Sequence, residues 1–197
     1  MSRDTATVFD HLHQYGVDIR QRRIFLHGPI WAAGSEGGST IPIGIDHVIR
    51  NFLWLDKTKG DIELFICTQG GSIVDGFGLY DLVIASANNV TGVVYGECCS
   101  AGLFPLLACD HRYATKNAWF MWHRSGTGVD YGESLDDASK RIEMEERVDE
   151  RTNQIMGERT SKDKGWWKNK LKQGELWLDA EEMMEIGLIS ELWNGEG

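Results

Sequence analysis

The chain has 197 residues, of which 42% are apolar and 25% charged, a composition typical of a globular protein with a sizeable core. Acidic residues outnumber basic ones by 30 to 20, and the net charge of −10 argues against a nucleic-acid surface, which needs clustered Lys and Arg. The sequence contains no apolar run of the ~20 residues that a membrane helix requires. We therefore expect neither nucleic acid nor a membrane as a partner.

Residues 1–22 mix charges throughout and have no apolar signal core, so we expect an N-terminal arm or short helix and a cytoplasmic protein. The four cysteines form no CxxC pair, which indicates reduced, buried thiols rather than disulfides or a zinc site. On a strand, His11 and His13 would face the same way and could bind a metal ion, but the sequence offers no third ligand nearby.

Apolar periodicity predicts alternating strands and helices in the first two thirds of the chain. In chain order, the predicted elements are a strand at 23–27, a small-residue loop at 34–40, a helix at about 44–57, a strand at 61–67, a helix at about 74–87, a strand at 90–95, a helix from near Ser100 and a strand at 120–122. This alternation predicts an α/β fold with right-handed crossovers, formed by a single domain over residues 23–197.

The last third is predicted to be mostly helical. Residues 134–158 are rich in charge and carry a sparse apolar face, which suggests a helix that projects and packs against another subunit. A helix near 161–172 and the segment around Trp177 follow. Asp179 and Glu182 have the spacing of a capping box, so a helix should begin there and end at Gly187, before a last strand at 188–192.

Two glycine-bracketed turns between strand and helix carry the candidate chemistry. The first is Thr68-Gln-Gly-Gly-Ser72 and the second is Gly96-Glu-Cys-Cys-Ser-Ala-Gly102. In the second turn Ser100 would sit at a helix N-terminus, where the N–H of Ala101 is free to bind an oxyanion together with the N–H of Gly71. A serine nucleophile needs an adjacent base, and His123 ends a strand at the same kind of edge. A third group should orient that histidine.

Simpler interpretations exist for each residue. Ser100 could be a helix N-cap, His123 a strand-end histidine with a backbone partner, and Cys98 and Cys99 either core residues or thiol nucleophiles. A second Gly-Gly-Ser at 37–39 lies in what looks like a plain loop, and the charged run at 143–151 is most simply a solvated helix face.

Five motifs in the same order resemble the Clp-protease (ClpP) family over roughly residues 15 to 192. They are the approach and first strand at 15–28, the run from Asp61 through Ser72 to Asp81, the turn at 96–102, the histidine strand Phe120-Met-Trp-His123, and the closing segment from Leu178 to Ile189. The resemblance implies a ClpP/crotonase-like fold of repeated β-β-α units, with a projecting handle over about residues 125–160.

The resemblance also implies the site and the assembly. It assigns Ser100 as nucleophile, His123 as base, Glu175 as the orienting acid, and the amides of Gly71 and Ala101 as oxyanion donors. An extended substrate would lie as an added strand between Ser72–Ile73 and Ser125-Gly126-Thr127. Family members form heptameric rings, usually stacked as tetradecamers. They take unfolded polypeptides from an ATP-driven AAA+ unfoldase and use no metal or bound cofactor. Residues 1–22 would then form the axial segment.

Departures from the family pattern leave alternatives open. Gln69 replaces the proline before the glycine pair, Cys98 and Cys99 replace small residues, the loop at 31–44 is longer, and the acid is glutamate, with Asp179 as a fallback. The favoured function is an ATP-dependent serine endopeptidase subunit. The second hypothesis is a catalytically weak ring subunit that regulates an active paralogue. The third is a crotonase homologue that acts on acyl-CoA esters.

Overall fold

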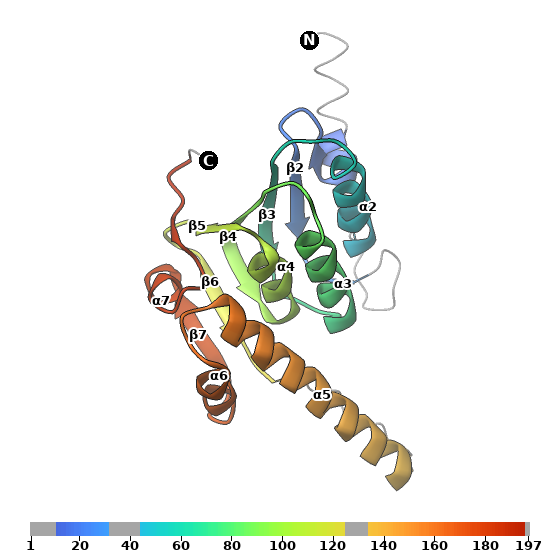
Figure 1. Cartoon of the computed structure of the whole chain (residues 1–197), viewed down its shortest axis with the longest axis vertical. Coiled ribbons are helices and arrows are strands. Elements are labelled where there is room, and N and C mark those ends of the chain that lie inside the picture. The colour runs from blue at the N-terminus through green and yellow to red at the C-terminus, as the bar shows by residue number, and fades with distance from the viewer. Residues whose placement is uncertain (1–10, 32–43, 125–133, 196–197) are drawn as a thin grey trace.

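An eight-stranded sheet organises the computed structural model of the chain, which describes residues 11–31, 44–124 and 134–195 (Figure 1). The strands are β1 (Val17–Asp18), β2 (Arg23–His27), β3 (Ile62–Thr68), β4 (Val90–Cys99), β5 (His111–Ala114), β6 (Trp119–Trp122), β7 (Leu176–Asp179) and β8 (Glu191–Leu192). The order across the sheet is β1-β2-β3-β4-β5-β8, while β6 pairs with β4 and β7 pairs with β6.

Neighbouring strands from β2 to β5, and on to β8, run parallel, so the chain must cross back between them. Helices make most of these returns, and the α/β class predicted from the sequence is confirmed. They are α2 (Ile45–Leu55), α3 (Ile73–Ile84), the short 3-10 turn η1 (Ser100–Gly102) continuing into α4 (Leu103–Ala108), α5 (Leu135–Arg159), α6 (Lys164–Leu171) and α7 (Ala180–Glu185).

Strand β4 changes its partner halfway along its length. Its first half pairs with β5 through residues 91–94, and its last three residues pair in parallel with β6. The chain then adds β7 antiparallel to β6. The β6–β7 pair therefore extends from the carboxyl end of β4, so the residues that follow β4 and β6 emerge at the same edge.

The core lies between the sheet and the layer formed by α2, α3 and α4 (Figure 1). Helix α4 is buried at all six positions, as a fully apolar helix in a core should be. Each large apolar side chain buried in this way stabilises the fold by about 1.5–3 kcal/mol. This burial anchors the turn at Ser100, from which α4 continues.

Helix α5 extends away from the sheet, as the sequence predicted for residues 134–158 (Figure 1). Leu135 at its start is 91% exposed, and its buried residues lie near its C-terminal end, at Thr152, Asn153, Ile155 and Met156. That end is held by Arg159, whose guanidinium donates hydrogen bonds to the carbonyls of Leu107, Ala108 and Cys109 at the end of α4.

Several local expectations were incomplete. Strands β1, β5 and β7 were not predicted, because two to four residues show too little alternation to signal a strand. Residues 11–15 are helical, so His11 and His13 do not lie on a strand, and side chains two apart on a helix do not face each other. The final strand was predicted at 188–192, but β8 covers only Glu191–Leu192. Leu188 and Ile189, which gave the apolar signal, are buried just before β8 begins.

Candidate active site

Strands β4 and β6 bring a serine and a histidine to one edge of the sheet. Because the two strands are parallel with Cys99 opposite Met121, both chains leave the ladder in the same direction. Ser100 is the next residue after β4, and His123 is the next residue after β6. The Oγ atom of Ser100 lies 2.9 Å from Nε2 of His123, which is hydrogen-bonding distance. The structure thus joins two residues that are 23 positions apart in the sequence.

Ser100 has an unusual backbone conformation. Its φ angle is 52°, in the left-handed region that residues other than glycine seldom adopt. Such strain persists where the surrounding structure imposes it, often at functional sites. Ser100 is not a helix N-cap, because Cys99 precedes η1 and the Ser100 hydroxyl contacts His123 instead. Ser72 has the capping role at the other turn, where its Oγ accepts a hydrogen bond from the Asp75 N–H at the start of α3.

In the glycine pair of the first turn, Gly70 packs directly against Ser100 and Gly71 packs against Ile30. Gly70 has φ 87°, and a Cβ atom there would lie 2.5 Å from the Cys99 carbonyl oxygen and 2.7 Å from Cβ of Ser100. Gly71 has φ 146°, and a Cβ atom there would lie 2.6 Å from the Ile30 carbonyl oxygen. Both the conformation and the space therefore require glycine at these two positions.

The backbone at this turn pairs with Ile30 on one side. The Ile30 N–H donates to the Gly70 carbonyl, and the Ser72 N–H donates to the Ile30 carbonyl. Since neighbouring residues of an extended chain direct their polar groups to opposite sides, the N–H of Gly71 points away from Ile30. The Ala101 nitrogen lies 3.0 Å from where a Cβ of Gly70 would be. The backbone of this turn therefore packs against the residue that follows Ser100.

Glu175 lies just outside the β6–β7 ladder. The last pair in that ladder joins Trp122 to Leu176, and His123 and Glu175 are the residues that adjoin this pair on the two chains. The Glu175 side chain is exposed, and its Oε2 accepts a hydrogen bond from Nε1 of Trp177 at 3.1 Å. Among the described residues, the recorded hydrogen bond of the His123 ring is with Ser100 and none joins it to a carboxylate.

The alternative acid, Asp179, is a helix cap. Its side chain accepts a hydrogen bond from the Glu182 N–H, and the Glu182 side chain accepts one from the Asp179 N–H. This is the capping box expected from the sequence. Asp179 is paired with Trp119 at the far end of the β6–β7 ladder, well away from His123.

The thiols beside Ser100 are poor candidates for a nucleophile. All four cysteines are free, and Cys98, Cys99 and Cys109 are buried. Burial raises the pKa of Cys98 well above its ordinary range. Burial and the neighbouring Glu97 carboxylate raise the pKa of Cys99 to about 12. At neutral pH both groups therefore remain thiols, whereas the reactive species is the thiolate.

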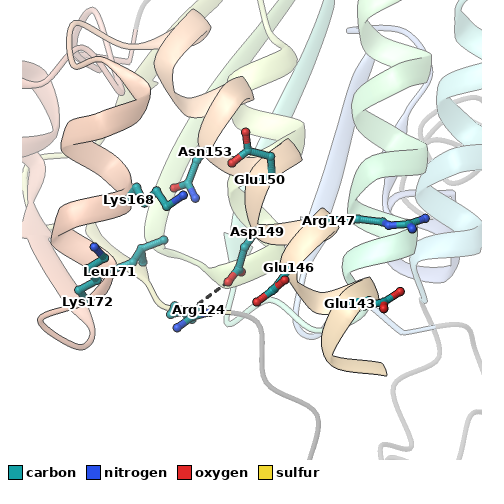
Figure 2. A pocket seen from close by; sticks show the side chains of 10 residues that line it. All are labelled: Arg124, Glu143, Glu146, Arg147, Asp149, Glu150, Asn153, Lys168, Leu171 and Lys172. Atoms are coloured by element: carbon teal, nitrogen blue, oxygen red, sulfur yellow. Dashed lines mark hydrogen bonds and ion pairs between the residues drawn. The ribbon is translucent and has the colours of Figure 1, made fainter. Parts of the chain in front are cut away.

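A charged cleft of about 640 Å³ opens beside the pair, between α5 and α6 (Figure 2). It begins at Arg124, the residue after His123, whose Nε lies 3.0 Å from a carboxylate oxygen of Asp149. Four acidic and four basic side chains line it together with Leu171 and Asn153. The run at 143–151 of α5, predicted to be a solvated helix face, is exposed or half-buried, and part of it faces α6 across this cleft.

Ile73 begins α3 directly after its N-cap Ser72. Ser125, Gly126 and Thr127 lie outside the described residues. Within the described ranges, no three His, Cys, Asp or Glu side chains are grouped as metal ligands. The helices that the structure describes include none long and apolar enough to cross a membrane.

Comparison with known protein families agrees with the fold and with the arrangement of motifs. The model of the Clp protease family matches residues 13–196. The chain therefore belongs to the Clp protease family, a family of proteases, and its mixed α/β sheet with the projecting α5 is consistent with the fold of that family.

Proposed function

We propose that the chain is a serine endopeptidase subunit that hydrolyses peptide bonds of unfolded polypeptides. The observation that carries this proposal is the 2.9 Å contact between Ser100 Oγ and His123 Nε2, made by a serine in a left-handed conformation. A serine hydroxyl becomes a nucleophile when an adjacent imidazole takes its proton.

The proposed reaction follows from the positions of these groups. Nε2 of His123 accepts the hydroxyl proton as Ser100 Oγ attacks the substrate carbonyl carbon, and the carbonyl oxygen becomes an oxyanion. The N–H groups of Gly71 and Ala101 stabilise that oxyanion, each by about 2.7–4 kcal/mol in comparable sites. His123 then gives its proton to the leaving amine. Water, activated by the same imidazole, releases the acyl group from Ser100.

The remaining residues bind the substrate and orient the base. The substrate would lie extended beside Ser72 and Ile73, adding its backbone to this edge of the sheet. Glu175 would accept a hydrogen bond from Nδ1 of His123 and hold Nε2 toward Ser100. We further propose a cytosolic heptameric ring, stacked as a tetradecamer, whose chamber receives chains from an AAA+ unfoldase. The steps above need no metal ion or bound cofactor.

A fluorophosphonate probe tests the proposal on the assembled protein. We expect it to label Ser100 and to block cleavage of fluorogenic peptides. Ser100→Ala should abolish both reactions while the oligomer, measured by native mass spectrometry, keeps its size. An unlabelled Ser100 in a correctly assembled oligomer would refute the peptidase.

A second function, a ring subunit with little activity of its own that regulates an active paralogue, has one observation in its favour. The carboxylate of Glu175 bonds to Trp177 rather than to His123. Peptidase assays with the purified chain separate the two functions, since turnover by this chain alone excludes the regulatory role as its whole function.

A further inference from the structure

The β6–β7 ladder places the carboxylate of Glu175 within reach of His123. Residues directly opposite in an antiparallel pair project their side chains to the same face, with Cα atoms about 4.5–5.5 Å apart. His123 and Glu175 are the next residues beyond the last such pair, Trp122 and Leu176. Rotation of the Glu175 side chain alone would therefore carry its carboxylate toward the imidazole.

Trp177 holds that carboxylate in another place. Side chains two apart on a strand share a face, and the indole N–H of Trp177 donates to Oε2 of Glu175 at 3.1 Å. This bond joins the carboxylate to the indole of the residue paired with Met121, while the His123 ring in the described part of the chain is hydrogen-bonded to Ser100. A donor on the carboxylate also makes it a weaker acceptor for a second N–H.

We propose that Trp177 is a positioning residue that holds Glu175 away from His123, so the chain rests with an incomplete triad. The inference builds on the peptidase proposed above. The two arrangements of Glu175 are close in energy, because Trp177 is 51% exposed and a hydrogen bond at an exposed site adds little net stability. Turning the indole does not disturb the core, so the Glu175 carboxylate can be released without unfolding.

Trp177→Phe tests this, because it removes the N–H and keeps an aromatic ring. We expect kcat to rise roughly twofold to tenfold with KM unchanged. We also expect the acid limb of the pH–rate profile to move to higher pH, since an imidazole paired with a carboxylate keeps its proton longer. Trp119→Phe is the matched control: Trp119 is 52% exposed and is paired with Asp179 at the other end of the ladder.

Glu175→Gln gives the second arm of the test. In that background Trp177→Phe should leave kcat and the pH profile as they are in Glu175→Gln alone, because no carboxylate is present to release. A structural role for the indole would still lower stability in this background, which a thermal melt would record.

The outcomes separate this inference from the proposed function. If wild type and both tryptophan variants assemble but none is labelled at Ser100, the peptidase itself is wrong. If wild type is labelled and Trp177→Phe behaves as Trp119→Phe does, or is slower, Trp177 does not restrain Glu175 and this inference alone is overturned.

Discussion

Gly70→Ala should disable the site through its backbone. The added Cβ would lie 2.5 Å from the Cys99 carbonyl oxygen, 2.7 Å from Cβ of Ser100 and 3.0 Å from the Ala101 nitrogen. None of these atoms is the end of a flexible side chain. The two turns must therefore separate by several tenths of an ångström or more, which displaces Ser100 and Ala101, the proposed nucleophile and oxyanion donor, together.

The magnitude follows from two effects. An alanine at φ 87° is in a left-handed conformation that costs about 1–2 kcal/mol, and relieving the clash adds a similar amount, so we expect the free energy of unfolding to fall by about 2–4 kcal/mol. Misplacement of a reacting group by about 1 Å costs on the order of 10²-fold in rate, and loss of an oxyanion donor costs on the order of 10²–10³-fold. We therefore expect kcat/KM to fall by roughly 10²–10³-fold.

The rate of fluorophosphonate labelling at Ser100 measures this effect without an unfoldase, and urea unfolding measures the stability. Gly78→Ala is the matched control, because a Cβ there meets nothing within 4 Å and the residue is in α3. Alanine in a helix is favoured over glycine by about 1 kcal/mol, so this variant should be slightly more stable and fully active. Labelling of Gly70→Ala at the wild-type rate would refute the proposed contact between the two turns.

Three further changes have distinct expected results. Glu175→Gln should lower kcat by up to about 10⁴-fold if the carboxylate orients His123 during turnover; an unchanged kcat would remove Glu175 from the mechanism. Arg159→Leu should lower the free energy of unfolding, measured by urea titration, by about 2–4 kcal/mol, because three carbonyls at the end of α4 lose a charged donor. Arg151 is exposed, and the control variant Arg151→Leu should change this free energy by less than about 0.5 kcal/mol. Burial raises the pKa of Cys109 from 9.0 to about 12, so above pH 9 the unfolded chain releases a proton that the folded chain keeps, and stability falls as pH rises. Between pH 9 and 12, Cys109→Ala should reduce this loss of unfolding free energy by up to about 1.4 kcal/mol per pH unit. Urea titrations at several pH values measure it, and an equal dependence on pH in wild type and Cys109→Ala would contradict the buried thiol.

Much of the fold could be predicted because strong local patterns determine it. The helix predicted at 44–57 is α2, the helix at 74–87 is α3, and the capping box at Asp179 begins α7. Both glycine turns could be recognised in the sequence because each one follows a run of apolar residues, and these runs form the strands that end at Thr68 and Cys99. Patterns of this kind depend only on residues close in sequence.

The rest depends on pairings that no local pattern records. The contact of Ser100 with His123 requires β4 to leave β5 and continue with β6, and the mark of that change in β4 is Gly96, with φ 93°, which does not by itself say which strand becomes the new partner. Glu175 could be aligned with the orienting acid from a resemblance. Its bond to Trp177, however, depends on the torsions of one exposed side chain. On a strand, Glu175 and Trp177 would lie on the same face, and this spacing was the available signal for their bond. It was missed because β7 itself was not predicted.

The left-handed serine has a consequence for how this protein tolerates change. Holding Ser100 at φ 52° costs on the order of 1–2 kcal/mol, which glycine at the same position would recover. At position 100, stability therefore favours glycine, whereas the proposed reaction requires the serine hydroxyl. Selection for thermal robustness alone would replace the hydroxyl that we propose attacks the substrate, and a library screened only for folded protein should accumulate glycine there.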